Sequence, residues 1–212
     1  MAYNLEEQEQ LENLKAFWKQ YGNFILTVVT VAALAVAGWR GVGWYQARVA
    51  AQASAVYEQL REAASARDAD KVRAAAGTLF DQYGGTAYGQ MAALVAARAY
   101  VDAGDSRAAR VTLEWAVSNA TDDEFRHAAR LRLAALLIDE KAFDEAGRLL
   151  AIDAPGKFAG EYADRRGDLL VAQGRPDEAG AAYRQALEAL EPDSPMRRLV
   201  QLKLDGLGKE AG

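Results

Sequence analysis

The longest apolar stretch of the chain lies near its N-terminus, from Gln20 to Trp39. These twenty residues carry no charge and are bounded by Lys19 and Arg40. A helix rises ~1.5 Å per residue, so the stretch would cover ~30 Å, the thickness of a bilayer's hydrocarbon core. The residues at its ends are of the types that anchor at a membrane–water interface. The expected anchors are Trp18, Tyr21, Trp39, Arg40, Trp44 and Tyr45. The sequence therefore predicts a single transmembrane helix.

Two other interpretations of this stretch remain open. Ala35-Val36-Ala37 is the A-x-A pattern of a signal-peptide cleavage site. The nineteen residues before the apolar run contain four glutamates and two lysines, however, whereas a signal peptide has a short basic segment there. A buried helix of a soluble domain is the other alternative, although an uncharged run this long is rare in such cores. An uncleaved anchor is favoured.

The pattern on either side of the span is also helical. Residues 4–19 place Leu11, Leu14, Phe17 and Trp18 on one face, which predicts a short amphipathic helix. Residues 46–66 are rich in Ala, Glu, Gln and Arg, so we expect a helix that continues directly from the span. The predicted organisation is an amphipathic segment over residues 1–19, a span with its interfacial exit over 20–45, and a helical domain over 46–212.

That last domain is built from repeats. Four segments share a Gly-Asp turn or its equivalent, followed by a small residue at a fixed distance: Ala66 to Phe80, Ala103 to Val117, Glu140 to Ala154 and Gln173 to Leu187. The shared small positions are Val72, Ala109, Ala146 and Ala179, at spacings of 37, 37 and 33 residues. A helical pair of ~34 residues is the tetratricopeptide period. GRPDEAGAAYRQAL in the fourth segment resembles that family's G-[DN]-[YF]-x-E-A-x-x-x-[YF]-x-x-A-L motif, while the third lacks the turn Gly and the first is degenerate.

Both helices of each pair show the expected apolar stripe. In the second helices the small position is followed four residues later by Ala76, Leu113, Leu150 and Tyr183. In the first helices Ala97, Ala134 and Gly167 occupy the close-contact position. Residues 196–207 form a last amphipathic helix that would cover the end of the stack, and no alternating strand pattern occurs. We predict an all-α protein in which the span is followed by a tetratricopeptide-like solenoid of about four helical pairs.

The composition of the chain argues against several classes of function. The net charge is −5, all of it after residue 49, and an acidic domain is a poor nucleic-acid binder. There is no cysteine, and His127 is the only histidine, so a metal site or cofactor is not expected. Asp122, Asp123 and Glu124 indicate a helix N-terminus rather than a cation site. No combination of nucleophile, base and orienting group can be assembled, so we do not expect an enzyme.

A stack of helical pairs presents a concave surface lined by the first helices of the pairs. Repeat position predicts a partner-binding groove that contains Tyr57, Arg61, Met91, Arg98, Val101, Ile138, Asp164 and Asp168. Leu94 and Leu131 share this position, and they are the two most expected to be core residues. Apolar side chains mixed with Arg suit an extended or partly unfolded polypeptide.

Over its full length the chain resembles the YfgM family, the ancillary subunits of the SecYEG translocon. The resemblance is carried by MAYNLEEQEQLENLKAFWKQYGNF before the span, GWRGVGWYQ after it and LVQLKLDGL near the end. It implies a cytoplasmic N-terminus, one span in the bacterial inner membrane and a periplasmic repeat domain. It also implies partners: SecYEG, a PpiD-like periplasmic chaperone and translocated polypeptides. Charge near the span does not determine orientation, because Lys15 and Lys19 balance Arg40 and Arg48.

Two other functions stay open. The repeats could form an adaptor in a cell-envelope assembly or stress-signalling complex that binds folded partners only. A cytoplasmic regulator tethered to the membrane would require the opposite topology.

Overall fold

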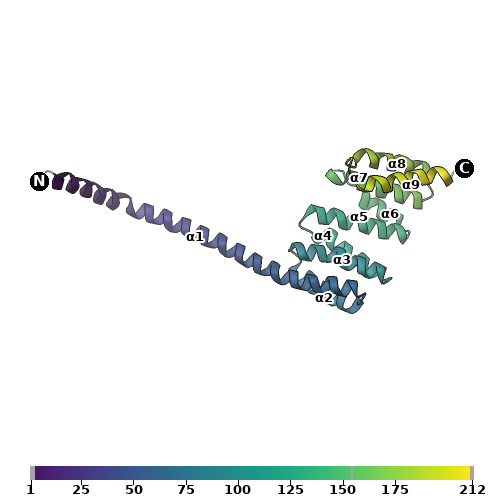
Figure 1. Cartoon of the computed structure of the whole chain (residues 1–212), viewed down its shortest axis with the longest axis horizontal. Coiled ribbons are helices and arrows are strands. Elements are labelled where there is room, and N and C mark those ends of the chain that lie inside the picture. The colour runs from purple at the N-terminus through teal and green to yellow at the C-terminus, as the bar shows by residue number, and fades with distance from the viewer. Residues whose placement is uncertain (1–2, 154, 211–212) are drawn as a thin grey trace. The chain divides into compact units, whose positions relative to one another are not determined.

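The computed structural model describes residues 3–153 and 155–210, and the side chains of 7–153 and 155–208 (Figure 1). Every regular element in that range is helical, which confirms the predicted all-α class. The elements are α1 (Tyr3–Ser65), α2 (Ala69–Tyr83), α3 (Ala87–Asp102), α4 (Ser106–Asn119), α5 (Asp123–Asp139), α6 (Phe143–Leu150), the 3₁₀ turn η1 (Gly156–Phe158), α7 (Ala159–Ala172), α8 (Pro176–Ala189) and α9 (Met196–Glu210). Met1 and Ala2 of the N-terminal motif, Ala154 of the third segment and Gly212 lie outside the described residues.

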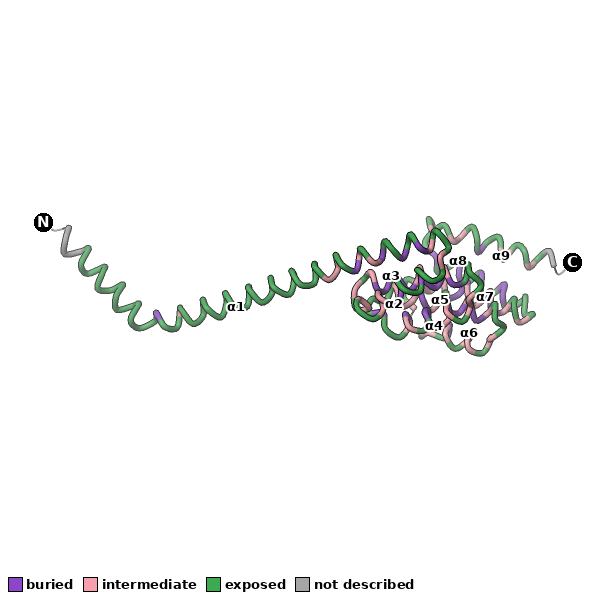
Figure 2. Tube along the Cα trace, turned by 90° about the horizontal axis from the view of Figure 1, so that it is seen from below, coloured by how far each residue is buried: buried purple, intermediate pink, exposed green. Residues whose placement is uncertain are grey.

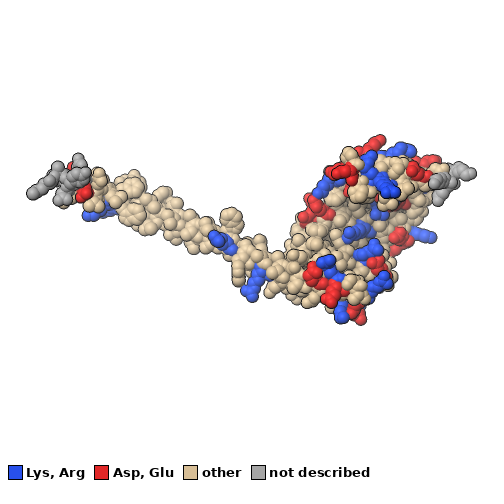
Figure 3. All heavy atoms as spheres, in the orientation of Figure 1, with Lys and Arg blue, Asp and Glu red and all other residues tan. Residues whose placement is uncertain are grey.

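The chain divides into two compact units, one up to Val49 and one from Ala50 onward. The first unit is α1 up to Val49, and its side chains are exposed along nearly its whole length (Figure 2). The amphipathic helix predicted over residues 4–19 is not a separate element, because α1 runs from Tyr3 without interruption. Figure 3 shows the stretch without charged side chains between the basic residues of this unit. Among the described residues, α1 is the one helix long and apolar enough to cross a membrane, and none of its most apolar stretch is buried.

The second unit contains the predicted solenoid. Buried side chains near the end of α1 belong to the same cluster as those of α2, which makes these two helices the first pair. The following pairs are α3 with α4, α5 with α6, and α7 with α8. The pairs follow one another in chain order in Figure 1, and α9 packs on α8 as the predicted final helix. The predicted continuation of the span into residues 46–66 is confirmed, since α1 reaches Ser65.

The turn inside each pair has the same backbone geometry in all four repeats. One residue takes a positive φ at the end of the first helix: Arg67 (56°), Gly104 (78°), Lys141 (60°) and Gly174 (73°). The next backbone N–H then donates to the carbonyl five residues earlier, at 3.0, 2.8, 2.8 and 2.9 Å in chain order. This is the Schellman arrangement, which uses carbonyls that the helix end leaves unpaired. Glycine suits it best, yet Arg67 and Lys141 adopt it too, so a missing turn Gly does not end the repeat pattern.

The small positions predicted from the repeat lie in the interior of the stack. Val72, Ala109, Ala146 and Ala179 are all fully or almost fully buried. The clearest close contact among the first helices is at Gly167 of α7. A Cβ placed on Gly167 would lie 2.3 Å from Cε1 of Tyr183 on α8, so only glycine lets this aromatic ring pack here.

The buried apolar side chains form two clusters. The larger cluster runs from Ala53 on α1 through α2–α6 to Tyr162 and Leu169 on α7. The smaller cluster joins α7, α8 and α9 around Tyr183 and Val200. Stacking of neighbouring pairs thus buries a nearly continuous interior, as expected for a solenoid.

Candidate binding groove

A groove of about 800 Å³ runs along the first helices of the repeat pairs. Its lining comes from α1, α3, α5 and α7, together with a few residues of α2, α4 and the turns between helices. The apolar part of the lining includes Met91, Leu94, Val95, Val101 and Leu136. Most of the lining belongs to α3 and α5, whereas α1 adds Tyr57 and Ala64 and α7 adds Arg165 alone, so the groove is centred on the second and third repeats.

The predicted groove residues divide into two groups. Tyr57, Met91, Arg98 and Val101 line the groove, as does Leu94. Arg61 is exposed outside it and pairs with Glu58 on its own helix at 3.1 Å. Ile138 and Leu131 pack against the larger core cluster. Repeat position thus places the α3 residues in the lining of the groove, and their binding of a partner stays a prediction.

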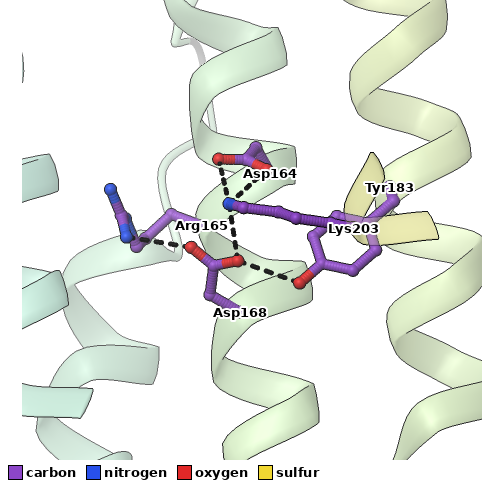
Figure 4. A network of polar contacts seen from close by, with 5 residues as sticks. All are labelled: Asp164, Arg165, Asp168, Tyr183 and Lys203. Atoms are coloured by element: carbon purple, nitrogen blue, oxygen red, sulfur yellow. Dashed lines mark hydrogen bonds and ion pairs between the residues drawn. The ribbon is translucent and has the colours of Figure 1, made fainter. Parts of the chain in front are cut away.

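Asp164 and Asp168 are the main correction to the predicted groove. Asp164 is 2% exposed, and neither residue lines the groove. Lys203 of α9 instead reaches both carboxylates, at 2.8 Å from Asp164 Oδ1 and 2.7 Å from Asp168 Oδ1 (Figure 4). Tyr183 donates its hydroxyl to Asp168 Oδ1 at 2.9 Å. We call these four residues the α9 cluster; it ties the last helix to the fourth repeat.

The interior position of the α9 cluster changes its acid–base properties. Burial raises the pKa of Asp164, and this outweighs the opposing effect of the bond from Lys203. Burial also raises the pKa of the Tyr183 hydroxyl, with Asp168 as the second cause. Each charged side chain of the cluster therefore has a specific partner and little contact with water. Such a cluster is a structural clamp, and removal of one partner would leave a buried charge unpaired.

The groove carries charge of a different kind. Four arginines lie in its lining: Arg67, Arg98, Arg132 and Arg165. Two aspartates lie there as well: Asp102 and Asp139. Arg98 binds Asp102 through Nε, at 2.9 and 3.0 Å from the two carboxylate oxygens. Burial, with Arg98 as the second cause, lowers the pKa of Arg132. The groove is thus apolar with an excess of positive charge.

Sequence reasoning missed Lys203, Arg132 and Arg165. Lys203 lies on the same face of α9 as the buried Val200 and the partly buried Leu207, and a lysine within an apolar stripe is a signal of a buried partner. Arg132 follows Val95 by 37 residues, one repeat period, and both line the groove. Arg165 has no comparable signal, because its place depends on how α7 packs beside α5.

His127 and the acidic residues before it have structural roles. The Asp122 side chain accepts from the Glu124 backbone N–H at 2.7 Å, which confirms the predicted start of α5. The His127 ring stacks on Phe158, and its Nδ1 lies 2.9 Å from the Tyr162 hydroxyl. Within the part of the chain that the structure describes, no three His, Asp or Glu side chains gather as a metal site would require.

The predicted membrane anchors lie in the first unit. The aromatic rings of Trp18, Tyr21, Trp39, Trp44 and Tyr45 are all exposed there, between 44% and 81% of their surface. Arg40 is exposed as well. Their role at a membrane interface stays a prediction.

Comparisons with known proteins agree with this architecture. Residues 15–209 match the model of a family described as a tetratricopeptide repeat-like domain. A protein of Neisseria gonorrhoeae named ancillary SecYEG translocon subunit is 36% identical over 98% of this chain and 100% of its own length. Proteins of the same name are 28% identical in Haemophilus influenzae, over 98% of this chain and 100% of the relative, and 26% identical in Escherichia coli, over 95% and 96%.

Tetratricopeptide-like repeats are a protein-interaction fold, which agrees with the prediction of a binding protein rather than an enzyme. The described residues show the features that such a fold requires, namely stacked helical pairs, close-packed small residues and a groove along the first helices. By the family model and by its full-length relatives, the chain belongs to the tetratricopeptide repeat-like family of ancillary SecYEG translocon subunits.

Proposed function

We propose that this protein is a membrane-anchored subunit of the SecYEG translocon that binds translocated polypeptides in its groove and helps pass them to periplasmic chaperones. The association with SecYEG is carried over from the names of full-length relatives. The polypeptide binding rests on one observation, the groove of about 800 Å³ along α1, α3, α5 and α7. Its apolar walls suit a chain whose apolar side chains are not yet buried in a fold.

The proposal includes a topology. Residues 1–19 lie in the cytoplasm, residues 20–45 cross the inner membrane and leave its interface, and residues 46–212 form the periplasmic repeat domain. The length and exposure of the apolar part of α1 support a span. A reporter fused after Gly212 that is active only in the periplasm is the expected result. Activity only in the cytoplasm would favour a tethered cytoplasmic regulator.

A PpiD-like periplasmic chaperone is the proposed recipient of the bound chain. The physical requirement is that binding in the groove be reversible. Purification of the tagged full-length protein from native membranes in mild detergent, with mass spectrometry, should recover SecY together with this chaperone. Recovery of a different envelope complex without the translocon would favour the adaptor function.

The groove itself is tested by site-specific photo-crosslinking in native membranes that hold a secreted protein stalled in translocation. Val101 lies in the groove and is 44% exposed, whereas Val111 on α4 is 60% exposed and lies outside it. A photoreactive residue at Val101 should crosslink to the stalled chain, and the same residue at Val111 should not. Equal yields at both positions, or none at either, would contradict polypeptide binding in the groove.

A further inference from the structure

We infer that the groove recognises a carboxylate side chain within an extended apolar segment, and that Arg132 is the residue that anchors this carboxylate. The inference rests on the proposed function, since it names the class of polypeptide that the same groove takes. It goes further by predicting a preference for Asp or Glu, at one position, among otherwise apolar residues.

The length of the groove favours a side chain from the interior of a segment over a chain end. The lining extends from Tyr57 and Ala64 of α1 through α3 and α5 to Arg165 of α7, and packed neighbouring helices lie about 8–10 Å apart. Three such steps span about 24–30 Å, which an extended chain covers with about seven to nine residues at ~3.3 Å each. Arg132 belongs to α5, the third of the four helices. A segment that fills the groove therefore has residues on both sides of the one that meets Arg132.

Charge complementarity selects the carboxylate. The repeat domain carries the whole net charge of −5, yet its groove is lined by four arginines and two aspartates. Arg98 and Asp102 neutralise one another. The rest of the lining keeps a positive excess, which attracts acidic segments and repels basic ones.

Arg132 has donors to offer. Its one hydrogen bond among the described residues runs from Nη1 to the Leu94 carbonyl at 3.5 Å, at the long limit for such a bond. No carboxylate of the described residues lies within ion-pair distance of it. A guanidinium has five N–H donors in a planar fork that matches a carboxylate, so a bound Asp or Glu could take two of them. It would also offset the repulsion from Arg98 that helps lower the pKa of Arg132.

Arg165 adds to the positive wall of the groove. Its Nη1 donates to Asp168 Oδ2 at 2.9 Å, while its buried Nε has no hydrogen-bond partner among the described side chains. Figure 4 shows Arg165 on the opposite side of Asp168 from Lys203, so Asp168 shares its negative charge between the two. The guanidinium is therefore only partly neutralised where it borders the groove.

The apolar lining determines what surrounds the carboxylate. Leu94 and Val95 of α3 line the groove and are only partly buried, and Arg132 Nη1 reaches the Leu94 carbonyl. A wholly acidic segment would leave these side chains in contact with water, whereas apolar neighbours of the carboxylate would bury them. The predicted ligand is thus a segment with one Asp or Glu flanked by residues such as Leu and Val.

The test uses the full-length protein in detergent micelles and three fluorescently labelled nine-residue peptides with blocked ends. They share flanking Leu, Val and Ser residues and differ only at the central position, which is Glu, Gln or Lys. We expect the Glu peptide to bind about tenfold more tightly than the Gln peptide, with the Lys peptide weakest, and added salt to narrow the difference. Arg132→Gln should remove the preference for Glu, so that the Glu and Gln peptides bind this variant with similar affinity. The matched control is Arg148→Gln, an exposed arginine of α6 outside the groove.

The outcomes separate this inference from the proposed function. If the Glu and Gln peptides bind equally and both are weakened by Leu94→Asp, the groove binds polypeptide but the role of Arg132 is overturned. A fourth peptide has Gln at its centre and a free C-terminus. If this peptide binds and the three blocked peptides do not, the groove takes chain ends, which also overturns the inference. If no peptide binds and Val101 gives no crosslink, the proposed function fails with it. Arg132→Lys, which keeps the charge but loses the fork, should retain part of the preference.

Discussion

The α9 cluster and the groove both gather charged side chains on the repeat domain, but only in the cluster does every charge have a partner. Lys203 bonds to both oxygens of Asp164 and to one of Asp168, and Tyr183 bonds to Asp168 as well (Figure 4). In the groove Arg98 is paired, whereas Arg132 has one long bond to a backbone carbonyl. The comparison teaches that charge on the same set of helices can serve two purposes. Paired and buried charge holds the stack together, and charge left open to solvent is available for a ligand.

The largest effect should follow from removal of Lys203. Lys203→Met would leave Asp164 as a buried carboxylate without its cation, and we expect a loss of about 3 kcal/mol in the free energy of unfolding. Urea unfolding of the full-length protein in micelles, followed by circular dichroism, measures it. Lys157→Met breaks an exposed ion pair with Glu124 and should cause no measurable change. Addition of Asp164→Asn to Lys203→Met should restore part of the loss; if it does not, the cluster acts through packing alone.

The next effect concerns the packing that brings Tyr183 to the cluster. Gly167→Ala would place a methyl group against the Tyr183 ring, and we expect a net loss of about 2 kcal/mol. Gly77→Ala is the matched control, because a Cβ at Gly77 meets nothing within 4 Å. That change should instead stabilise the protein by about 0.5–1 kcal/mol through helix propensity. Similar behaviour of the two variants in urea unfolding would show that α7 can shift away from Tyr183.

His127 should have a smaller effect on stability than Lys203 or Gly167, and this effect depends on pH. Burial lowers its pKa below the ordinary value of 6.5, with nearby Arg130 as the second cause. The folded state therefore favours the neutral ring, so this contribution to stability is fully present above pH 6.5 and is lost as the pH falls through the folded-state pKa. His127→Gln should reduce the drop in melting temperature between pH 7.5 and pH 5.5. A drop identical to that of the unaltered protein would assign the pH dependence to other groups.

The smallest effect on stability is expected in the groove. Arg132→Gln should change the free energy of unfolding by less than about 0.5 kcal/mol, because it removes one long hydrogen bond and no ion pair among the described residues. The same urea experiment as for Lys203 provides the direct comparison. A loss of unfolding free energy close to that of Lys203→Met would show that Arg132 is a structural residue. The groove and the α9 cluster would then not differ in the role of their charged side chains.

The repeat architecture could be predicted because it depends on local patterns. Ala109, Ala146 and Ala179 recur at nearly constant spacing, and each is fully buried. The period also pointed to the first helices as the face that carries a groove, and Met91, Arg98 and Val101 line it, whereas their binding of a partner stays a prediction. Spacing alone could not show that Asp164, unlike these residues, is buried and does not line the groove. Whether a side chain at a groove position points outward or is covered depends on the next element, and α9 covers Asp164.

By itself, the sequence determined the helices, their pairing and the apolar run long enough to cross a bilayer, since each follows from the order of apolar, small and charged residues along the chain. Only the tertiary structure decided that Lys203 meets Asp164, 39 residues away, and that Arg132 lies in the groove without a carboxylate beside it. It also showed that Arg67 and Lys141 adopt the positive φ that glycine provides in the other two turns. The physical reason is that a side chain's partner is set by how successive helices rotate and pack against one another, which no single repeat encodes.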